Sequence, residues 1–195
     1  MKKIKIVIFI FGLLGIVACS EDYVPKPVGY FRIASQERDY ASLETAYPFV
    51  FDIPSNVFLV EKTDSLKTEN WFDMYYPFYK ARIYCTYTPV PNQNELKKLI
   101  EDNHQFVYRH IVKAQAIEEA YFEYPENDVS GVLYVLKGNT ATPIQFFATD
   151  STRHFFRASL YFDSNSNQDS LAPVISYIYD DIQHIISTFK WENQR

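Results

Sequence analysis

The sequence predicts an α+β fold in which a mainly antiparallel sheet packs against a mid-chain helix and a C-terminal helix. Alternating apolar and polar residues fill short segments before residue 90 and again between residues 114 and 162, as expected of strands. Between these two regions, and near the C-terminus, apolar residues recur at helical spacing. The connections between residues 114 and 162 are too short for parallel crossovers, so this part of the sheet is expected to be antiparallel.

The first residues have the features of a bacterial lipoprotein signal. Three lysines precede an uncharged apolar run, residues 6–18, which is shorter than the roughly 20 residues that a membrane span needs. The run ends in Ile16-Val17-Ala18-Cys19, which resembles a lipobox. This resemblance implies that residues 1–18 are removed and that acyl chains on Cys19, including palmitate, hold the mature protein at a membrane. An ordinary cleaved signal with a chance cysteine is the alternative.

A tether and one domain are expected after the signal. Residues 19–29 contain two prolines and no apolar periodicity, which is typical of an extended linker, and residues 30–195 are long enough for one α+β domain. Ser20 follows the cysteine where an aspartate would indicate retention in the inner membrane. The periplasmic side of the outer membrane is therefore the expected location. Glu21 and Asp22 resemble a surface-export signal, and a solvated linker explains them equally well.

The mature chain is acidic and has one further cysteine. The sequence contains 19 Lys and Arg against 24 Asp and Glu, and the signal takes away three of the lysines. This balance, without a basic cluster along the sequence, argues against nucleic acid or an anionic lipid surface as a partner. Cys85 falls on the same face of a predicted strand as Ala81 and Ile83, so we expect a buried, unreactive thiol without a disulfide.

Short strands are expected in the first half of the chain. The segments that carry the pattern are 30–33, 47–54, 57–60, 70–76 and 78–88. Tyrosine and phenylalanine are abundant, at 16 residues each, and such side chains fit best on sheet faces. An exposed aromatic platform that binds carbohydrate or a protein is the alternative use of these residues.

A helix and a four-stranded meander are expected in the middle of the chain. Asn92 and Glu95 form the pattern of a capping box, and the apolar residues of the helix that follows are Leu96, Leu99, Ile100, Phe106 and Val107. Short polar turns then separate four strands. These strands are expected at 114–124, 129–137, 143–149 and 154–162.

A polar loop and a second helix complete the domain. The loop, residues 163–170, alternates Asp and Asn like the start of a calcium-binding EF-hand, but it lacks the turn glycine and the final glutamate. A helix cap at Asp169 or Ser170 is therefore expected. The helix has Pro173 in its predicted first turn and an apolar stripe formed by Val174, Ile175, Ile178, Ile182, Ile185, Ile186 and Phe189.

Motifs for catalysis or cofactor binding are absent from the sequence. GxSxG, HExxH, CxxC and phosphate-binding glycine loops do not occur. His104 and His110 are six residues apart, which places them off a common helix face, so no zinc site is expected. We therefore expect a protein without enzymatic activity, cofactor or metal.

A set of polar residues between 109 and 157 is the candidate interaction patch. Its members are Lys113, Lys137, Asn139, Gln145, Asp150, His154 and Arg157. Capping of strands and turns is the alternative role for these residues. A convergent pocket at Asp150 and His154 would indicate chemistry, a flat surface rimmed by aromatic residues would indicate a protein partner, and a curved groove with tyrosines would indicate a glycan.

Longer stretches of the sequence resemble known families. The run YPFVFDIP, the helix before the meander and the ending Ser187-Thr188-Phe189-Lys190-Trp191 resemble the Mog1/PsbP-like sandwich. Residues 131–162, with RHIVKAQAI before them and TFKW after them, resemble the gliding-motility lipoprotein GldD family, although Arg109 and residues 140–143 depart from its pattern. The second resemblance implies a non-enzymatic envelope lipoprotein that is required for gliding and for the associated type IX secretion, and that binds other envelope proteins. A module that binds a small ligand or glycan is the alternative.

Overall fold

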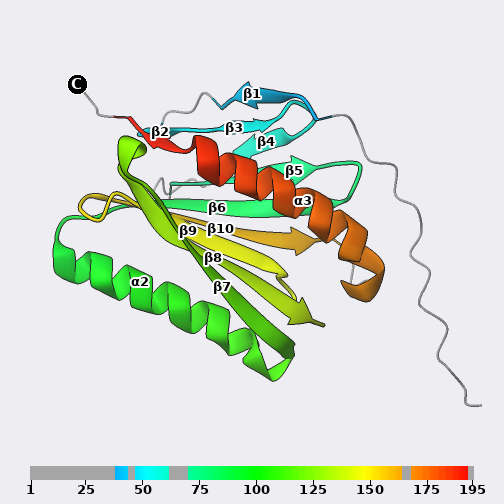
Figure 1. Ribbon diagram of the computed structural model, residues 1–195. Coiled ribbons are helices and arrows are strands. Elements are labelled where there is room, and N and C mark those ends of the chain that lie inside the picture. The colour runs from blue at the N-terminus through cyan, green and yellow to red at the C-terminus, as the bar shows by residue number, and fades with distance from the viewer. Residues whose placement is uncertain (1–37, 44–46, 62–69, 164–167, 193–195) are drawn as a thin grey trace, which may run out of the picture. The chain divides into compact units, whose positions relative to one another are not determined.

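The α+β class is confirmed by the computed structural model, which describes residues 38–43, 47–61, 70–163 and 168–192. These residues belong to the unit Phe31–Arg195 and form a seven-stranded sheet, two two-stranded sheets and two α-helices (Figure 1). The signal, Cys19, the tether, the strand expected over 30–33 and residues 164–167 of the calcium-like loop lie outside the described residues. The boundaries of the signal, the tether and the domain therefore stay predictions.

The large sheet is antiparallel throughout. Its strands are, in spatial order, β4 (Phe58–Glu61), β5 (Asn70–Tyr76), β6 (Ala81–Pro89), β10 (His154–Phe162), β9 (Ile144–Thr149), β8 (Val129–Gly138) and β7 (Ala114–Tyr124). The predicted meander is thus confirmed as β7 to β10. Its last strand pairs with β6, which joins the two halves of the chain in one sheet.

Two of the strands predicted before residue 90 differ from the structure by more than one residue. The strand expected over 78–88 begins at Ala81, because residues 77–80 form a turn in which Lys80 has a positive φ of 49°. The segment 47–54 forms two strands, β2 (Phe49–Val50) and β3 (Asp52–Pro54), which pair with different partners. These partners are β11 (Lys190–Trp191) and β1 (Tyr40–Ser42).

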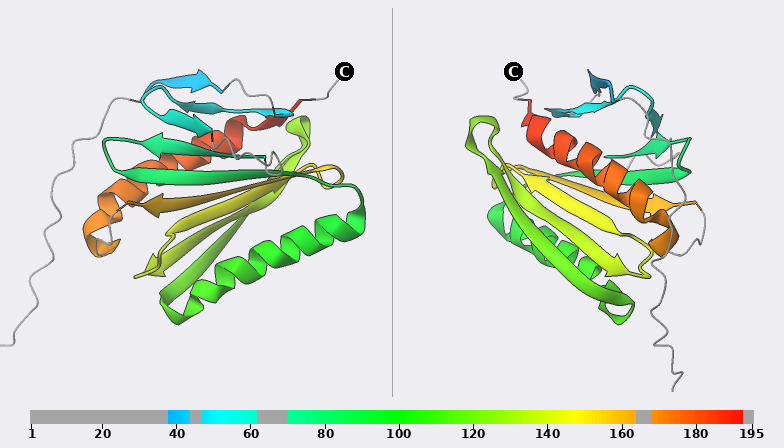
Figure 2. Two further views of the ribbon diagram at one scale, coloured as in Figure 1. Left: turned by 180° about the vertical axis from the view of Figure 1, so that it is seen from behind. Right: turned by 45° about the vertical axis from the view of Figure 1, so that its right-hand side comes forward.

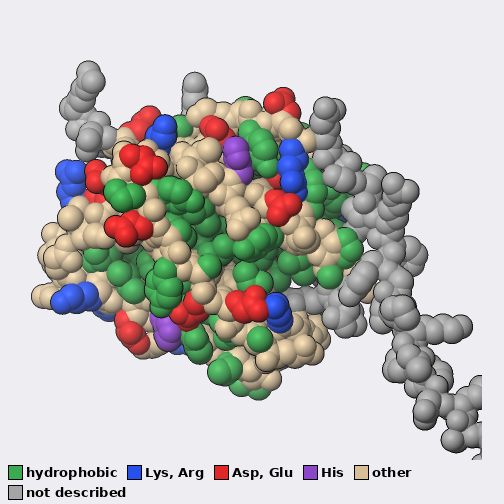
Figure 3. Space-filling model, viewed as in Figure 1, with side chains coloured by type: hydrophobic (Ala, Val, Ile, Leu, Met, Phe, Trp, Pro, Cys, Tyr) green, Lys and Arg blue, Asp and Glu red, His purple; other side chains and the backbone are tan. Residues whose placement is uncertain are grey.

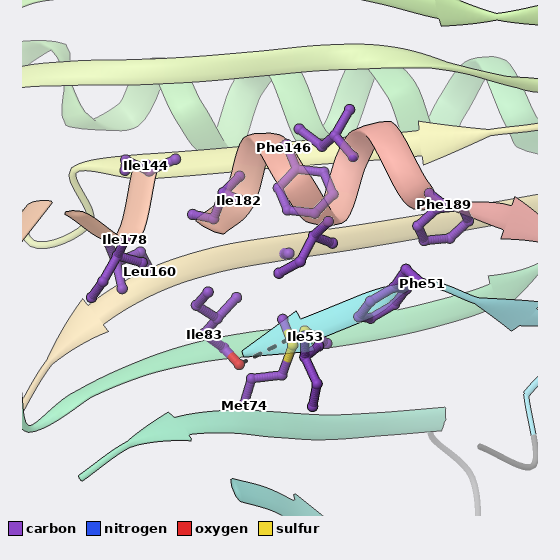
Figure 4. Close-up of a cluster of buried hydrophobic side chains, with 14 of the residues drawn as sticks. Phe51, Ile53, Met74, Ile83, Ile144, Phe146, Leu160, Ile178, Ile182 and Phe189 are labelled. Atoms are coloured by element: carbon purple, nitrogen blue, oxygen red, sulfur yellow. Dashed lines mark hydrogen bonds between the residues drawn. The ribbon is translucent and has the colours of Figure 1, made fainter. Parts of the chain in front are cut away.

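One face of the large sheet is covered by helix α3 (Gln168–Thr188), whose apolar stripe is confirmed as buried apart from the half-buried Ile175. Pro173 lies inside this helix and not in its first turn, because α3 begins at Gln168, within the expected loop. Figure 4 shows Ile178, Ile182 and Phe189 lying over the strands, where they share a core with Phe146, Leu160 and Ile83. Burial of each such side chain contributes about 1.5–3 kcal/mol.

Cys85 belongs to the same core. It is 1% exposed and has no disulfide partner, which confirms the predicted burial. Burial raises the pKa of its thiol well above the ordinary value, with a smaller contribution from the charge of Asp73. The thiolate that would react is therefore disfavoured.

Helix α2 (Gln93–Tyr108) packs on the opposite face of the sheet (Figure 2). Asn92 caps it as predicted, because its Oδ1 accepts hydrogen bonds from the backbone N–H groups of Asn94 and Glu95 at 3.0 and 3.1 Å. The helix contacts a second apolar cluster, whose strand residues are Val132, Tyr134, Leu136, Phe147, Phe155 and Ile117. A 3-10 turn, η1 (Arg109–Val112), continues α2 into β7.

Candidate functional site

The seven residues of the predicted patch occupy three regions of the large sheet. Lys113, Lys137 and Asn139 lie where β7 begins and β8 ends. Asp150 and His154 lie at the turn between β9 and β10, beside the opposite end of β8. Gln145 and Arg157 lie within the sheet, on the two paired strands between these ends.

The turn at Asp150 and His154 is held by internal contacts. Asp150 Oδ1 accepts hydrogen bonds from the backbone N–H groups of Thr152, Arg153 and His154 at 2.9, 2.7 and 2.9 Å. The ring of His154 stacks on Trp191 with centroids 5.0 Å apart, and its Nδ1 lies 2.8 Å from the hydroxyl of Tyr87. These contacts match the capping and turn-forming role considered for the two residues.

Lys137 forms an ion pair with Glu118 on the neighbouring strand β7. Both residues line a hollow of about 410 Å³ between α3 and the ends of β8 and β9, together with Ile144, Ile175 and Tyr179. Figure 3 shows apolar side chains across the middle of this side of the molecule. Because Lys137 is paired with Glu118, its charge is already neutralised and does not offer a free cation to a ligand in this hollow.

Gln145 and Arg157 are in contact on the face that carries α2. Arg157 Nη2 and Ser159 Oγ both donate to Gln145 Oε1, at 3.2 and 3.3 Å. Arg157 Nε and Gln145 Nε2 are buried and have no hydrogen-bond partner among the described residues. No Asp or Glu in the described part of the chain forms an ion pair with Arg157. Burial lowers the pKa of this guanidinium, and the nearby Tyr161 opposes that shift.

The sheet face beside α2 is partly open. Helix α2 packs over β7, β8, β9 and the start of β10, and no described element covers the rest of this face. There the strands β5, β6 and β10 present a hollow of about 460 Å³. We call its surface the open face and define it by Trp71, Tyr84, Thr86, Arg157, Ser159 and Tyr161. The buried Cys85 and Asp73 also line the hollow, and the carboxylate of Asp73 accepts a hydrogen bond from Arg82. Tyr84 is 38% exposed, and its ring meets Tyr161 edge to face at 5.2 Å.

A smaller hollow of about 150 Å³ lies between α2 and the sheet, and it shares Thr86 and Arg157 with the open face. We call it the Asn103 pocket; its remaining lining residues are Thr88, Leu99, Asp102, Asn103, Phe106 and Phe155. Asn103 is only 2% exposed, and neither atom of its amide group has a hydrogen-bond partner in the described residues. A buried amide without partners is costly in a stable fold.

Basic side chains gather beside this pocket. Two guanidinium groups lie over the ring of Phe106, that of Arg109 at 4.9 Å and that of Arg157 at 5.1 Å from its centroid. The ring is 40% exposed, so the expected burial of Phe106 in the helix stripe is wrong: it faces these charges. The pKa of His110 is lowered by burial, and also by the positive charges of Arg157 and Lys113. Two arginines, one directly after α2 and one on β10, thus contact one ring in a chain that is acidic overall.

The predicted patch included Lys113, Gln145 and Arg157 and began just after Arg109. It missed Asn103 and Phe106 as site residues. Asn103 had a signal in the sequence. It lies four residues after Leu99 and four before Val107, both of which belong to the buried stripe of the helix. A polar residue at such a position must find a partner in the core or serve a ligand.

The described residues contain neither a metal-binding cluster nor a helix that could cross a membrane. No group of three or more His, Cys, Asp or Glu side chains there is arranged to hold a metal ion. Within the same residues, no helix combines the length and the apolar character that crossing a membrane requires.

The chain was compared with known proteins. A family model described as gliding motility lipoprotein GldD matches residues 20–191. No curated protein matches the sequence. Among solved structures, the solution structure of cyanobacterial PsbP (CyanoP) from Synechocystis sp. PCC 6803 is similar, with 8% identity, a TM-score of 0.49, and coverage of 85% of this chain and 98% of that chain.

Proposed function

The chain belongs to the gliding motility lipoprotein GldD family, and from this premise we propose that it acts by binding other proteins of the gliding apparatus and of the associated type IX secretion system. Membership of the family implies a role in gliding motility. In this proposal the protein is held at the periplasmic side of the outer membrane by acyl chains on Cys19, and residues 19–29 link this anchor to the binding domain.

The composition of the open face is the main support for the binding proposal. Its residues include a tryptophan, two tyrosines and an arginine, which are the side chains that most often contribute the binding energy of protein interfaces. One of its tyrosines, Tyr84, is exposed, and Thr86 beside it on β6 is exposed too. A partner that covers these residues would remove apolar area from water, which stabilises a complex.

No enzymatic activity is part of the proposal. Asp150 and His154 are the pair that the sequence marked for possible chemistry, and their contacts hold a turn and a ring stack. Lys137 is engaged with Glu118. The family gives no catalytic residue to place on this chain.

A small ligand or glycan is the second candidate, and the size of the hollow on the open face favours it. The volume of about 460 Å³ falls in the range of small-molecule sites, which is roughly 300–1,000 Å³. Trp71, Tyr84 and Tyr161 line this hollow, and aromatic rings of this kind can pack against a sugar ring.

A photo-crosslinking amino acid at Tyr84 distinguishes the two candidates. The matched control replaces Tyr121, which is 79% exposed on β7 and separated from β6 by three strands. In living cells, residue 84 should capture envelope proteins of the gliding apparatus, and residue 121 should not capture the same set. Equal capture from both positions would overturn the assignment of the open face. Capture from neither, together with a glycan bound to the purified protein, would establish the second candidate.

A further inference from the structure

We propose that the Asn103 pocket receives an acidic side chain of the partner protein, so that docking is guided by an Asp- or Glu-containing segment. This inference rests on the proposed function, because it names the chemistry by which a partner on the open face would be recognised. The pocket and the open face share Arg157, so one segment could occupy both.

The charge of Arg157 is not paired with a carboxylate of the described residues. Its guanidinium is largely buried. It donates to the amide of Gln145, lies over the ring of Phe106 and is near Tyr161. Buried charges in proteins are normally paired with an opposite charge. A carboxylate from outside the chain would complete this pair.

Unused hydrogen-bond donors lie next to this charge. Arg157 Nε, Gln145 Nε2 and Asn103 Nδ2 are all buried and without partners in the described part of the chain. Asn103 and Arg157 line the same pocket. A carboxylate accepts several hydrogen bonds at once, and those from a guanidinium are among the strongest in proteins.

The size and the walls of the pocket select the ligand. Its volume of about 150 Å³ and its apolar residues Leu99, Phe106 and Phe155 suit one side chain that has a methylene stem and a carboxylate end. Asp102 also lines the pocket. Its negative charge disfavours a doubly charged phosphate group more than a singly charged carboxylate.

Charges around the entrance support the same ligand. Arg109 lies against Phe106, and His110 is close enough to Arg157 and Lys113 for their charges to lower its pKa. The whole chain has a net charge of −5, so this basic group is a local exception. An acidic segment would be repelled by most of the surface and attracted here, which favours docking in one place.

The test uses the full-length lipidated protein in detergent and a fluorescent hexaglutamate peptide, with a hexaglutamine peptide for comparison. The glutamate peptide should bind and the glutamine peptide should not. Arg157→Gln should weaken binding about tenfold or more, the loss expected when a charge-assisted hydrogen bond is removed. Arg157→Lys keeps the charge without the fork of donors and should fall between the two. Arg153→Gln is the matched control, because Arg153 is exposed in the turn before β10 and lines neither the Asn103 pocket nor the open face, and it should bind like the wild type.

Equal binding of both peptides would overturn the inference, and so would unchanged binding of the glutamate peptide by both Arg157 variants. It would also be overturned if inorganic phosphate displaced the peptide at the same concentration as free glutamate does. If Tyr84 still captures envelope proteins in that case, the proposed function stands and only the acidic ligand is wrong. If Tyr84 captures nothing while the peptide binds through Arg157, the partner-binding function fails and the carboxylate pocket stands.

Discussion

Phe122 lies opposite Gly131 in the ladder of β7 and β8, and its ring occupies the space that a side chain at residue 131 would need. A Cβ atom at residue 131 would lie 2.5 Å from Cζ of Phe122 and 2.0 Å from the carbonyl oxygen of Phe147. The phenyl ring can move aside, but the backbone of β9 cannot do so without breaking its pairing with β8. Glycine is therefore required where these three strands meet.

Gly131→Ala is expected to lower the free energy of unfolding by about 1–3 kcal/mol, the usual effect of an added group in a packed interior. Urea denaturation of the purified domain measures this change. Glu123→Ala is a suitable control, because Glu123 is exposed on β7 and pairs with the residue next to Gly131. It should change stability by less than about 0.5 kcal/mol. A Gly131→Ala protein as stable as the wild type would show that the strands around residue 131 adjust freely.

Asn103→Leu is expected to stabilise the fold and to weaken binding of the hexaglutamate peptide. The substitution nearly conserves volume and replaces two buried polar atoms without partners by apolar ones, a change worth about 1 kcal/mol. Paired urea denaturation and peptide titrations measure the two effects. Asn94→Leu, on the exposed side of α2, is the control and should change neither the free energy of unfolding nor the affinity for the peptide by much. A loss of stability in Asn103→Leu would mean that the amide has partners that support the fold.

The free energy of unfolding should fall as the pH is lowered below the ordinary histidine pKa of about 6.5. Burial lowers the pKa of both His154 and His110; Asp150 opposes the shift at His154, and Arg153 adds to it. The unfolded chain therefore binds more protons than the folded chain in this range, which costs stability as the pH falls through the lowered pKa values.

Urea denaturation at intervals between pH 8 and pH 5 measures this pH dependence. His154→Gln should make the dependence shallower, since one of the two histidines no longer titrates. Tyr87→Phe removes the hydroxyl that lies 2.8 Å from the His154 ring but keeps the histidine, so it should leave most of the dependence in place. A His154→Gln protein with the full slope of the wild type would assign the effect to other groups.

Local sequence patterns were sufficient for α2, the stripe of α3 and the meander, because each is set by residues close together in the chain. The pairing of Lys190 with Val50 joins segments from opposite ends of the domain. Each of these strands has two residues, too few for a periodic pattern, so β2 and β11 could not be predicted as separate strands.

The candidate site shows the same limit. Gln145 and Arg157 were both in the predicted patch, and they meet because they lie on paired neighbouring strands. The contact of Arg109 and Arg157 with one ring depends on where α2 ends over the sheet. The spacing of residues in the sequence does not predict where α2 ends over the sheet. The basic residues that are separated along the chain are therefore brought together only by the fold.

Cys19 and Cys85 allow a matched test of the lipid anchor. Both are cysteines of one chain, but Cys85 is buried in the core with its pKa raised, so it is not available for acylation. We expect Cys19→Ala to abolish incorporation of labelled palmitate and to release the protein from the membrane fraction. Cys85→Ala should retain both properties, even where it lowers stability by removing a buried side chain.

Acylated protein that remains with membranes after Cys19→Ala would contradict the anchor, and loss of the label in both variants would point to a general failure of export. Because no helix of the described residues could cross a membrane, release of the Cys19→Ala protein would identify the acyl chains as the attachment that holds the open face within reach of its partners.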